Sequence, residues 1–468
     1  MTGLPVSLLA VAGILLATAA IGSGVAVALV PRGLAWREER LAWGFAAGLA
    51  ILGGSVGLAF ALHSTPGWLW FLLLSAIVGL PARLVRFRRE APAPPPSEGG
   101  RIAGILLAIV IVGIALYALR ALTEPMWAND YVAIWGFKGK TFFAERHIPD
   151  RLFRWQALSF SHPEYPLGLP LLYAGIAFLL GRWDDHAMAL LFPFLQVATL
   201  LLLYGWLRRR GADRTLALAA AVLLSQFEPL YRAFTTGMAE VPLSFGVLLL
   251  GTALSDRIER TDPGASRRLA LAALVCAATK NEGLFFVAAA FLVAALSLFA
   301  RKGFAARAAA ILALPAALVV AAHRLIRGSL PLRDFDFTLL ARPADLAPRI
   351  GQSLEAVVRG TPAAAWVGLA ALAVLVAAGR ATPAGSALLA LAACGLAAYL
   401  FLPALAVEGP AWLVETAFFR TTAALAPLLA AGVTVRLLPV FGGSTGSAPG
   451  PAASAASPGP PTPSTRGS

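Results

Sequence analysis

Residues 127–140 read WANDYVAIWGFKGK, and they follow an apolar run that begins at Ile102 and carries no charge until Arg120. That run is close to the roughly 20 residues that a helix needs to cross a bilayer. Trp and Tyr favour the membrane–water interface because each has an apolar body and a polar tip. Charged groups so near a bilayer are costly and mark candidate functional positions. We therefore take Asp130 as the position around which the chain is organised.

The composition is that of a membrane protein. Of 468 residues, 59% are hydrophobic and 13% are charged, with a mean hydropathy of +0.76, whereas a soluble domain has about a quarter of its residues charged. The net charge of +14 comes from short basic clusters between apolar runs, a pattern typical of cytoplasmic loops and not of nucleic-acid binding. Cys276 and Cys394 lie within apolar runs and indicate neither a disulfide nor a metal site. We predict an all-α, polytopic helical bundle.

We predict about 13 transmembrane helices. Their approximate ranges are 5–30, 41–62, 68–82, 102–122, 187–207, 215–234, 238–255, 269–278, 284–300, 308–326, 363–379, 384–405 and 418–438. The short apolar run 164–180 is predicted to be a juxtamembrane helix, because counting it as a crossing would place the Arg208–Arg210 triplet outside. No cleavable signal is expected at the N-terminus.

The basic loops assign the sides of the membrane. Loops at 31–40, 83–101 and 208–210 are rich in Arg and are predicted to be cytoplasmic, which places the N-terminus and Asp130 outside the plasma membrane. On this assignment the inner side carries 22 Lys/Arg and 8 Asp/Glu, and the outer side carries 16 of each. We divide the chain into an N-terminal extension and cytoplasmic linker (1–101), a catalytic membrane domain (102–440) and a disordered tail (441–468).

Asp130 is the candidate catalytic base, although a helix N-cap is the alternative role. Helical spacing places Trp127, Tyr131, Trp135 and Lys138 on one stripe. Lys138 and Lys140 would then lie near Asp130 at the lipid surface, where they suit a phosphate or simply extend toward water.

Further candidate residues recur at predicted outer ends of helices. His162, Glu164 and Tyr165 belong to the segment HPEYP, where two prolines fix the chain. Glu240 begins an apolar run and could instead complement a helix dipole, and Lys280 and Glu282 share a tight turn where they could pair with each other. Arg420 opens the last crossing, where a cation opposes both the dipole and the positive-inside rule. We expect Asp184-Asp185 to cap a helix and Asp334 and Asp336 to be solvated.

Five segments in order resemble the GT-C superfamily of polyprenyl-phosphate-sugar glycosyltransferases, in the bacterial branch near protein O-mannosyltransferases and aminoarabinose transferases. They are Trp127–Lys140, His162–Pro166, Gly237–Pro242, Thr279–Gly283, and Arg420 with Pro427. The chain departs from the family in its first three crossings and in having Asn129, not an acid, beside Asp130. No cofactor is expected, and the missing paired acid gives a divalent metal no support.

The resemblance implies an inverting transfer of a sugar from a polyprenyl-phosphate carrier to a hydroxyl of a glycan, lipid or protein. Asp130 would deprotonate the acceptor, and Trp135, Lys138, Lys140, His162, Glu164, Tyr165, Glu240, Lys280, Glu282 and Arg420 would bind the substrates. Two other classes stay open: a lipid-linked sugar flippase or transporter, and a non-catalytic membrane-assembly protein. A transporter is expected to place its charges at mid-membrane, in repeated halves.

Overall fold

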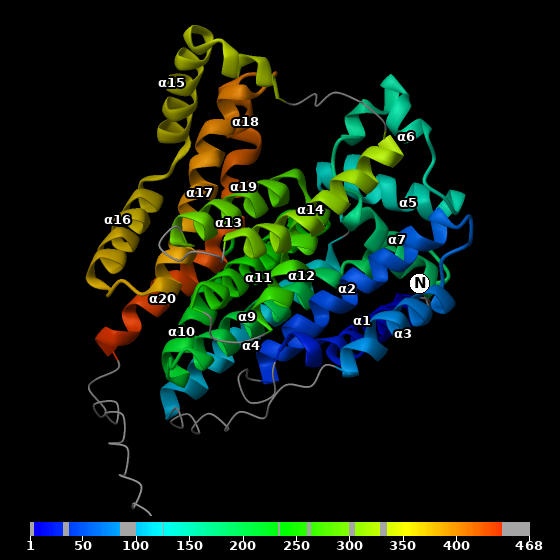
Figure 1. The fold of residues 1–468 in the computed structure, drawn as a ribbon, viewed down its shortest axis with the longest axis horizontal. Helices are drawn as coiled ribbons and strands as arrows, with labels where there is room; N and C mark the ends of the chain where they lie inside the picture. Colours follow the sequence, from blue (N-terminus) through cyan, green and yellow to red (C-terminus); the bar gives the residue numbers. More distant parts are fainter. Residues whose placement is uncertain are drawn as a thin grey trace, which may run out of the picture.

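The computed structural model is helical throughout the part of the chain that it describes, and its one β-bridge there joins Phe335 to Ala406 (Figure 1). The described residues are 4–30, 37–84, 100–124, 126–232, 235–259, 264–298, 305–327 and 335–441. The predicted disordered tail lies outside them, apart from Phe441. The first half contains α1 (Leu4–Leu29), α2 (Arg37–Ala61), α3 (Trp68–Leu84), α4 (Arg101–Thr123), η1 (Tyr131–Trp135), α5 (Gly136–Glu145), α6 (Arg151–Arg154), η2 (Gln156–Ser161), α7 (Gly168–Leu180), α8 (Asp185–Met188), α9 (Leu191–Arg209) and α10 (Arg214–Ser225).

The second half begins with the central helix and ends with a long broken helix. It contains α11 (Glu240–Glu259), α12 (Ala265–Thr279), α13 (Asn281–Leu298), α14 (Ala305–Arg327), η4 (Phe337–Ala341), α15 (Pro343–Gly360), α16 (Ala363–Ala378), α17 (Pro383–Leu405), α18 (Pro410–Leu413), η5 (Val414–Phe418), α19 (Phe419–Thr422), η6 (Ala423–Leu425) and α20 (Ala426–Phe441). From α18 to α20 the chain runs on without a loop, changing between α, π and 3-10 turns.

Seven helices of the described chain are long and apolar enough to cross a membrane, so the predicted membrane bundle is confirmed in this coarser form. They are Leu4–Leu29, Arg37–Ala61, Arg101–Thr123, Asp185–Arg209, Glu240–Glu259, Pro383–Leu405 and Pro410–Val440. Six shorter apolar helices accompany them, so the count of 13 crossings is not confirmed. In the described part of the predicted crossing at 215–234, the helix is α10, which has 12 residues and ends at Ser225, too short for about 30 Å of hydrocarbon at 1.5 Å per residue.

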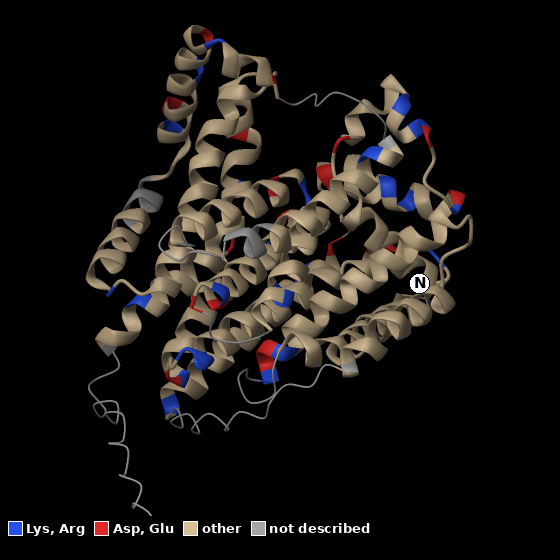
Figure 2. Cartoon of the chain, viewed as in Figure 1, with Lys and Arg blue, Asp and Glu red and all other residues tan. Residues whose placement is uncertain are grey.

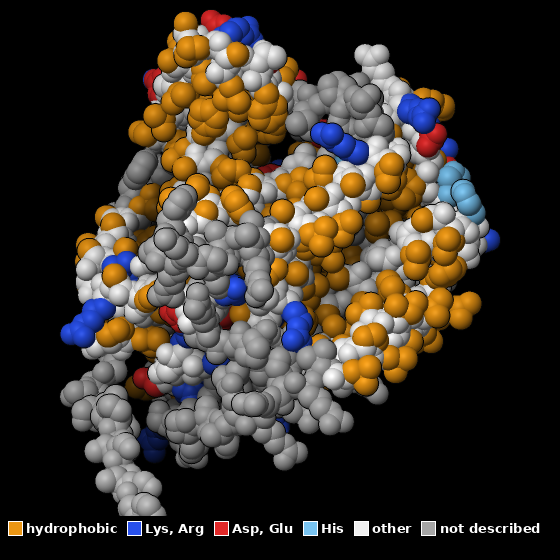
Figure 3. Space-filling view, viewed as in Figure 1, with side chains coloured by type: hydrophobic (Ala, Val, Ile, Leu, Met, Phe, Trp, Pro, Cys, Tyr) orange, Lys and Arg blue, Asp and Glu red, His pale blue; other side chains and the backbone are white. Residues whose placement is uncertain are grey.

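Burial separates central from peripheral helices. α11 is almost entirely buried and packs against α9, α12, α13, α17 and α20. α1 and α4 are more apolar than α11, yet only 28% and 22% of their membrane-length windows are buried inside the protein, which suits contact with lipid tails. Figure 2 shows that most of the length of the long helices carries no charge, and Figure 3 shows hydrophobic side chains covering the surface of the region where α1 and α3 lie.

The first three helices pack directly on the rest of the bundle. α2 contacts α7 and α9, and α1 packs on α2 and α3 (Figure 1). Glu39 at the start of α2 also pairs with Arg209 at the end of α9, at 2.8 Å. The division at residue 101 stays a prediction, but α1 and α2 share a continuous core with later helices.

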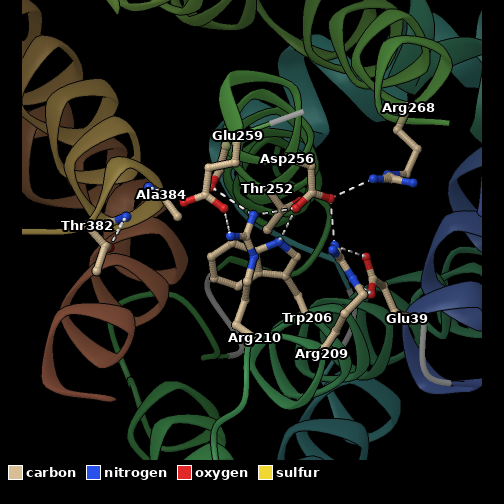
Figure 4. A network of polar contacts seen from close by, with 12 residues as sticks. Glu39, Trp206, Arg209, Arg210, Thr252, Asp256, Glu259, Arg268, Thr382 and Ala384 are labelled. Atoms are coloured by element: carbon tan, nitrogen blue, oxygen red, sulfur yellow. Dashed lines mark hydrogen bonds and ion pairs between the residues drawn. The ribbon is translucent and has the colours of Figure 1, made fainter. Parts of the chain in front are cut away.

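The C-terminal end of α11 carries a buried ionic cluster, which we call the arginine cluster. Its members are Glu39, Asp256, Glu259, Arg209, Arg210 and Arg268 (Figure 4). Asp256 accepts from all three arginines at 2.6 Å each. Three negative and three positive charges cancel, so the cluster joins α2, α9, α11 and α12 without leaving a net buried charge.

Candidate functional site

A second ionic cluster lies at the opposite, N-terminal end of α11. Glu240 is the first residue of that helix and is buried. Arg420 Nη1 lies 3.0 Å from Asp130 Oδ2, and Arg420 Nε lies 3.2 Å from Glu240 Oε1. Arg420 therefore bridges two carboxylates that are 110 positions apart in the sequence, and we call this group the outer cluster.

Lys280 extends the outer cluster from the turn between α12 and α13. Its Nζ lies 3.3 Å from Glu240 Oε1 and 2.7 Å from Glu282 Oε1. The predicted pairing of Lys280 with Glu282 is confirmed, and the pair with Glu240 is additional. The turn needs glycine at Gly283, because a Cβ there would lie 1.8 Å from the carbonyl oxygen of Cys276.

Glu240 of the outer cluster is 16 and 19 residues from Asp256 and Glu259 of the arginine cluster, so the two clusters are separated by about 24–29 Å along the axis of α11. This distance matches the usual thickness of the hydrocarbon core of a bilayer. The two polar clusters therefore lie at the two ends of a membrane-length helix, and none of their members needs to lie at the middle of the bilayer.

The backbone next to Asp130 is positioned by Tyr131, whose side chain contacts three other segments. The Tyr131 hydroxyl donates to Asp185, which also accepts from Trp183 Nε1 at 2.8 Å. The Tyr131 ring packs edge-on against Tyr173 and closely against Gly237. Gly237 has φ +93°, and a Cβ there would lie 2.8 Å from the Tyr131 ring, so only glycine fits without displacement. Asp130 itself makes no capping hydrogen bond, and its side chain contacts Arg420 instead.

Both partners of the Asp130–Arg420 pair are next to π-helical turns, a feature that the sequence analysis missed. η1 begins directly after Asp130, and η5 ends two residues before Arg420. A π turn rotates the residues that follow it relative to an α-helix, and such turns often occur at functional sites. No pattern of residue types in either segment distinguishes a π turn from an α turn.

The segment HPEYP forms a wall of stacked rings. His162 adopts a left-handed backbone conformation, with φ 49°, and its Nδ1 lies 3.0 Å from Glu164 Oε1. The Tyr165 ring stacks on the His162 ring at 4.8 Å and on the Trp135 ring at 5.3 Å. Trp135 and Glu164 are buried, whereas His162 is partly exposed.

Of the two lysines predicted to lie at the lipid surface, Lys138 does not lie there. Lys138 is fully buried and donates to the His162 carbonyl oxygen at 2.6 Å. Burial lowers the pKa of the Lys138 ammonium to about 7, against the opposing effect of the Glu164 carboxylate. Lys140 is exposed. The predicted stripe therefore faces the protein at Tyr131, Trp135 and Lys138, because aromatic rings and backbone carbonyls cover that side of the helix.

Burial is the main influence on Asp130, whose side chain is 22% exposed. It raises the pKa of the Asp130 carboxyl; Arg420 opposes this shift and Glu240 adds to it. The outer cluster holds three carboxylates and two cations, and Glu240 Oε2 is buried without a hydrogen-bond donor in the described part of the chain. Buried polar atoms are normally satisfied, so this oxygen is an acceptor whose partner within the described chain is missing.

The remaining acidic candidates are explained locally. Asp184 accepts from the backbone of Ala187 at 3.1 Å and caps α8, which confirms the predicted N-cap role. Asp336 caps η4 by accepting from the backbone of Thr338, and Asp334 lies outside the described residues. Within the described ranges, no three His, Cys, Asp or Glu side chains gather as a metal site.

Comparisons of this chain with models of protein families, with curated proteins and with solved structures found no match.

Proposed function

We propose that this chain is a membrane glycosyltransferase, which moves a sugar from a polyprenyl-phosphate carrier to an acceptor hydroxyl at the outer cluster. The observation that carries the proposal is the bridge that Arg420 makes between Asp130 and Glu240 at one end of a membrane-length helix. A partly exposed carboxylate, a fixed guanidinium and an unsatisfied carboxylate oxygen are the groups that such a transfer needs. These groups lie at one end of a membrane-length helix, a position that also suits a substrate with a lipid tail and a polar head.

Arg420 is the group best suited to hold the donor phosphate. A planar guanidinium can bind two oxygens of one phosphate at once, and Arg420 now contacts one oxygen from each of two carboxylates instead. We propose that the phosphate displaces Asp130 from Arg420 when the donor binds. Negative charge grows on the phosphate as the sugar–phosphate bond breaks, and a fixed cation stabilises that charge in the transition state.

The same exchange would prepare Asp130 as the base. Arg420 holds the pKa of Asp130 below the value that burial alone would give. Once the phosphate neutralises Arg420, the pKa of Asp130 rises further and the carboxylate becomes a stronger proton acceptor. Asp130 then removes the acceptor hydroxyl proton as the oxygen attacks the anomeric carbon. The phosphate leaves with the bonding electron pair, so one displacement inverts the configuration.

The other polar groups have supporting roles in this proposal. Glu240 Oε2 accepts a hydrogen bond from a sugar hydroxyl, and Lys280 keeps Glu240 ionised when the phosphate approaches. Tyr165 and His162 form one side of the sugar site, while buried Lys138 fixes the His162 backbone. Lys140, which is exposed, meets the phosphate or lipid head groups as the carrier enters.

We assign the outer cluster to the extracytoplasmic side. The opposite end of α11 holds Arg209, Arg210 and Arg268. Cytoplasmic ends of membrane helices carry an excess of Lys and Arg. Labelling of single-cysteine variants at position 140 in intact cells tests this side.

The direct test is to reconstitute the protein in nanodiscs with a panel of polyprenyl-phosphate hexoses and pentoses and an extract of cell-envelope acceptors. We expect free polyprenyl phosphate to appear only with acceptor present, together with a glycosylated product of inverted configuration. A flippase would instead move the intact donor across vesicles without releasing the carrier. An assembly protein would do neither, and either result would reject the proposal.

A further inference from the structure

A cavity of about 660 Å³ opens between α15 and the start of the last broken helix. Its size is within the usual range for ligand pockets. Figure 1 shows α15 beside α18 at one corner of the molecule, away from α5 and α6. The lining residues that matter for its chemistry are Glu355, Arg359, Glu408, Trp412, Glu415 and Phe419.

The charge of the cavity favours a cation over an anion. Three carboxylates and one guanidinium among these residues give a net charge of −2. Arg359 pairs with Glu355 at 2.5 Å. In the described chain Glu408 and Glu415 have no ion-pair partner and are exposed. Their carboxylates therefore remain available as acceptors for hydroxyl or ammonium groups.

Aromatic side chains form the apolar part of the lining. Trp412 is 51% exposed and Phe419 is 36% exposed, although both are large apolar residues. Trp412, Glu415 and Phe419 recur at spacings of three and four, so one side of the broken helix faces the cavity. The face of an aromatic ring is negative, and it therefore attracts the partly positive C–H face of a sugar ring and also an ammonium group.

The cavity and the outer cluster use neighbouring residues of the chain. Phe419 lines the cavity, and the next residue is Arg420. The Cα atoms of these two residues are about 3.8 Å apart. Successive helical residues point about 100° apart, so neighbouring sides of one helical segment serve the cavity and the Asp130–Arg420 pair. One helical segment therefore carries both a residue of the cavity and a residue of the outer cluster.

We propose that this cavity binds a saccharide, with a preference for one that carries a protonated amino group. The carboxylates of Glu408 and Glu415 receive its ammonium and hydroxyl groups, and Trp412 stacks on a sugar ring. The further statement that this saccharide is the acceptor of the transfer rests on the proposed function.

The test measures binding without any donor, so its outcome does not depend on transfer. Three tetrasaccharides serve as probes for the purified full chain in nanodiscs: an oligomer of glucosamine, its N-acetylated neutral form, and an anionic oligogalacturonate. We expect the glucosamine oligomer to bind roughly tenfold more tightly than the neutral form, as two exposed ion pairs allow, and the anionic oligomer to bind least.

Variants assign the binding to this cavity. Trp412→Ala should abolish binding of both the cationic and the neutral oligomer. The double variant Glu408→Gln/Glu415→Gln should equalise their affinities and keep neutral binding. Trp155→Ala is the matched control, because Trp155 is 60% exposed but lies outside the cavity. Equal binding of the three probes, or full binding by folded Trp412→Ala, would overturn the proposal. Saccharide binding without any transfer would leave it standing and refute the acceptor role.

Discussion

Replacing Arg420 by lysine tests whether the guanidinium fork matters, and not merely its charge. Arg420 contacts Asp130 through Nη1 at 3.0 Å and Glu240 through Nε at 3.2 Å. A lysine carries one nitrogen, which cannot occupy the separate positions of Nη1 and Nε, so at least one of these two contacts is lost or lengthened. Losing one contact to a charged group costs about 1.5–3 kcal/mol. This free energy corresponds to a decrease of roughly 10- to 150-fold in the kcat/KM for the donor.

We expect this loss in kcat/KM for the lipid-linked donor, measured in nanodiscs with the donor varied. The total charge of the outer cluster is unchanged in Arg420→Lys, so the unfolding temperature should fall by only a few degrees. Arg342→Lys is the matched control. Arg342 also pairs with two carboxylates, Asp336 at 3.1 Å and Asp345 at 3.6 Å, but it is exposed and separate from the cluster. If folded Arg420→Lys kept the kcat/KM of the wild type, the fork would have no role in donor recognition.

Three further predictions follow from burial, backbone geometry and ionisation. Asp256→Asn removes a carboxylate that three arginines share, so it should lower the free energy of unfolding by about 3–5 kcal/mol. The KM for the donor should not change. An unaltered denaturation midpoint would contradict a structural role for the arginine cluster. Gly237→Ala forces a Cβ against Tyr131 at φ +93° and should cost about 1–3 kcal/mol together with most of the activity, whereas Gly351→Ala, which meets open space, should be harmless. Asp130 must be ionised to accept a proton, so activity should decrease as the pH falls through a pKa raised above 3.8; an acid limb of the kcat/KM profile at or below that value would contradict the burial of this carboxyl.

Much of the helical framework could be predicted from the sequence. The uncharged runs around α1, α2, α4 and α17 are long, and long apolar runs leave a helix as the only way to satisfy the backbone in a bilayer. The shorter elements could not be assigned in the same way. α7 and α10 are apolar, but a helix of 13 or 12 residues can be buried in protein or inclined in a membrane, and composition does not separate these cases.

The outer cluster was also partly predictable. Asp130, Glu240, Lys280 and Arg420 were each identified as charges at helix ends, and the structure brings all four together. The sequence does not predict whether a side chain faces the lipid or the protein interior. An apolar stripe looks the same whether it meets lipid tails or neighbouring helices, so the burial of Lys138 against the His162 carbonyl was missed. The hydrogen bond from Tyr131 to Asp185 was missed because it joins separate elements.

The most direct measurement of the central claim is sugar transfer by purified Asp130→Asn in nanodiscs, with the donor supplied well above its dissociation constant. Asp150→Asn is the control, because the Asp150 side chain is 70% exposed and pairs with the equally exposed Arg154. Loss of a general base typically costs about 10²–10⁴-fold in rate, so we expect a decrease of that size in Asp130→Asn with donor binding retained and no change in the control. Transfer at the wild-type rate by a folded Asp130→Asn protein would contradict the account.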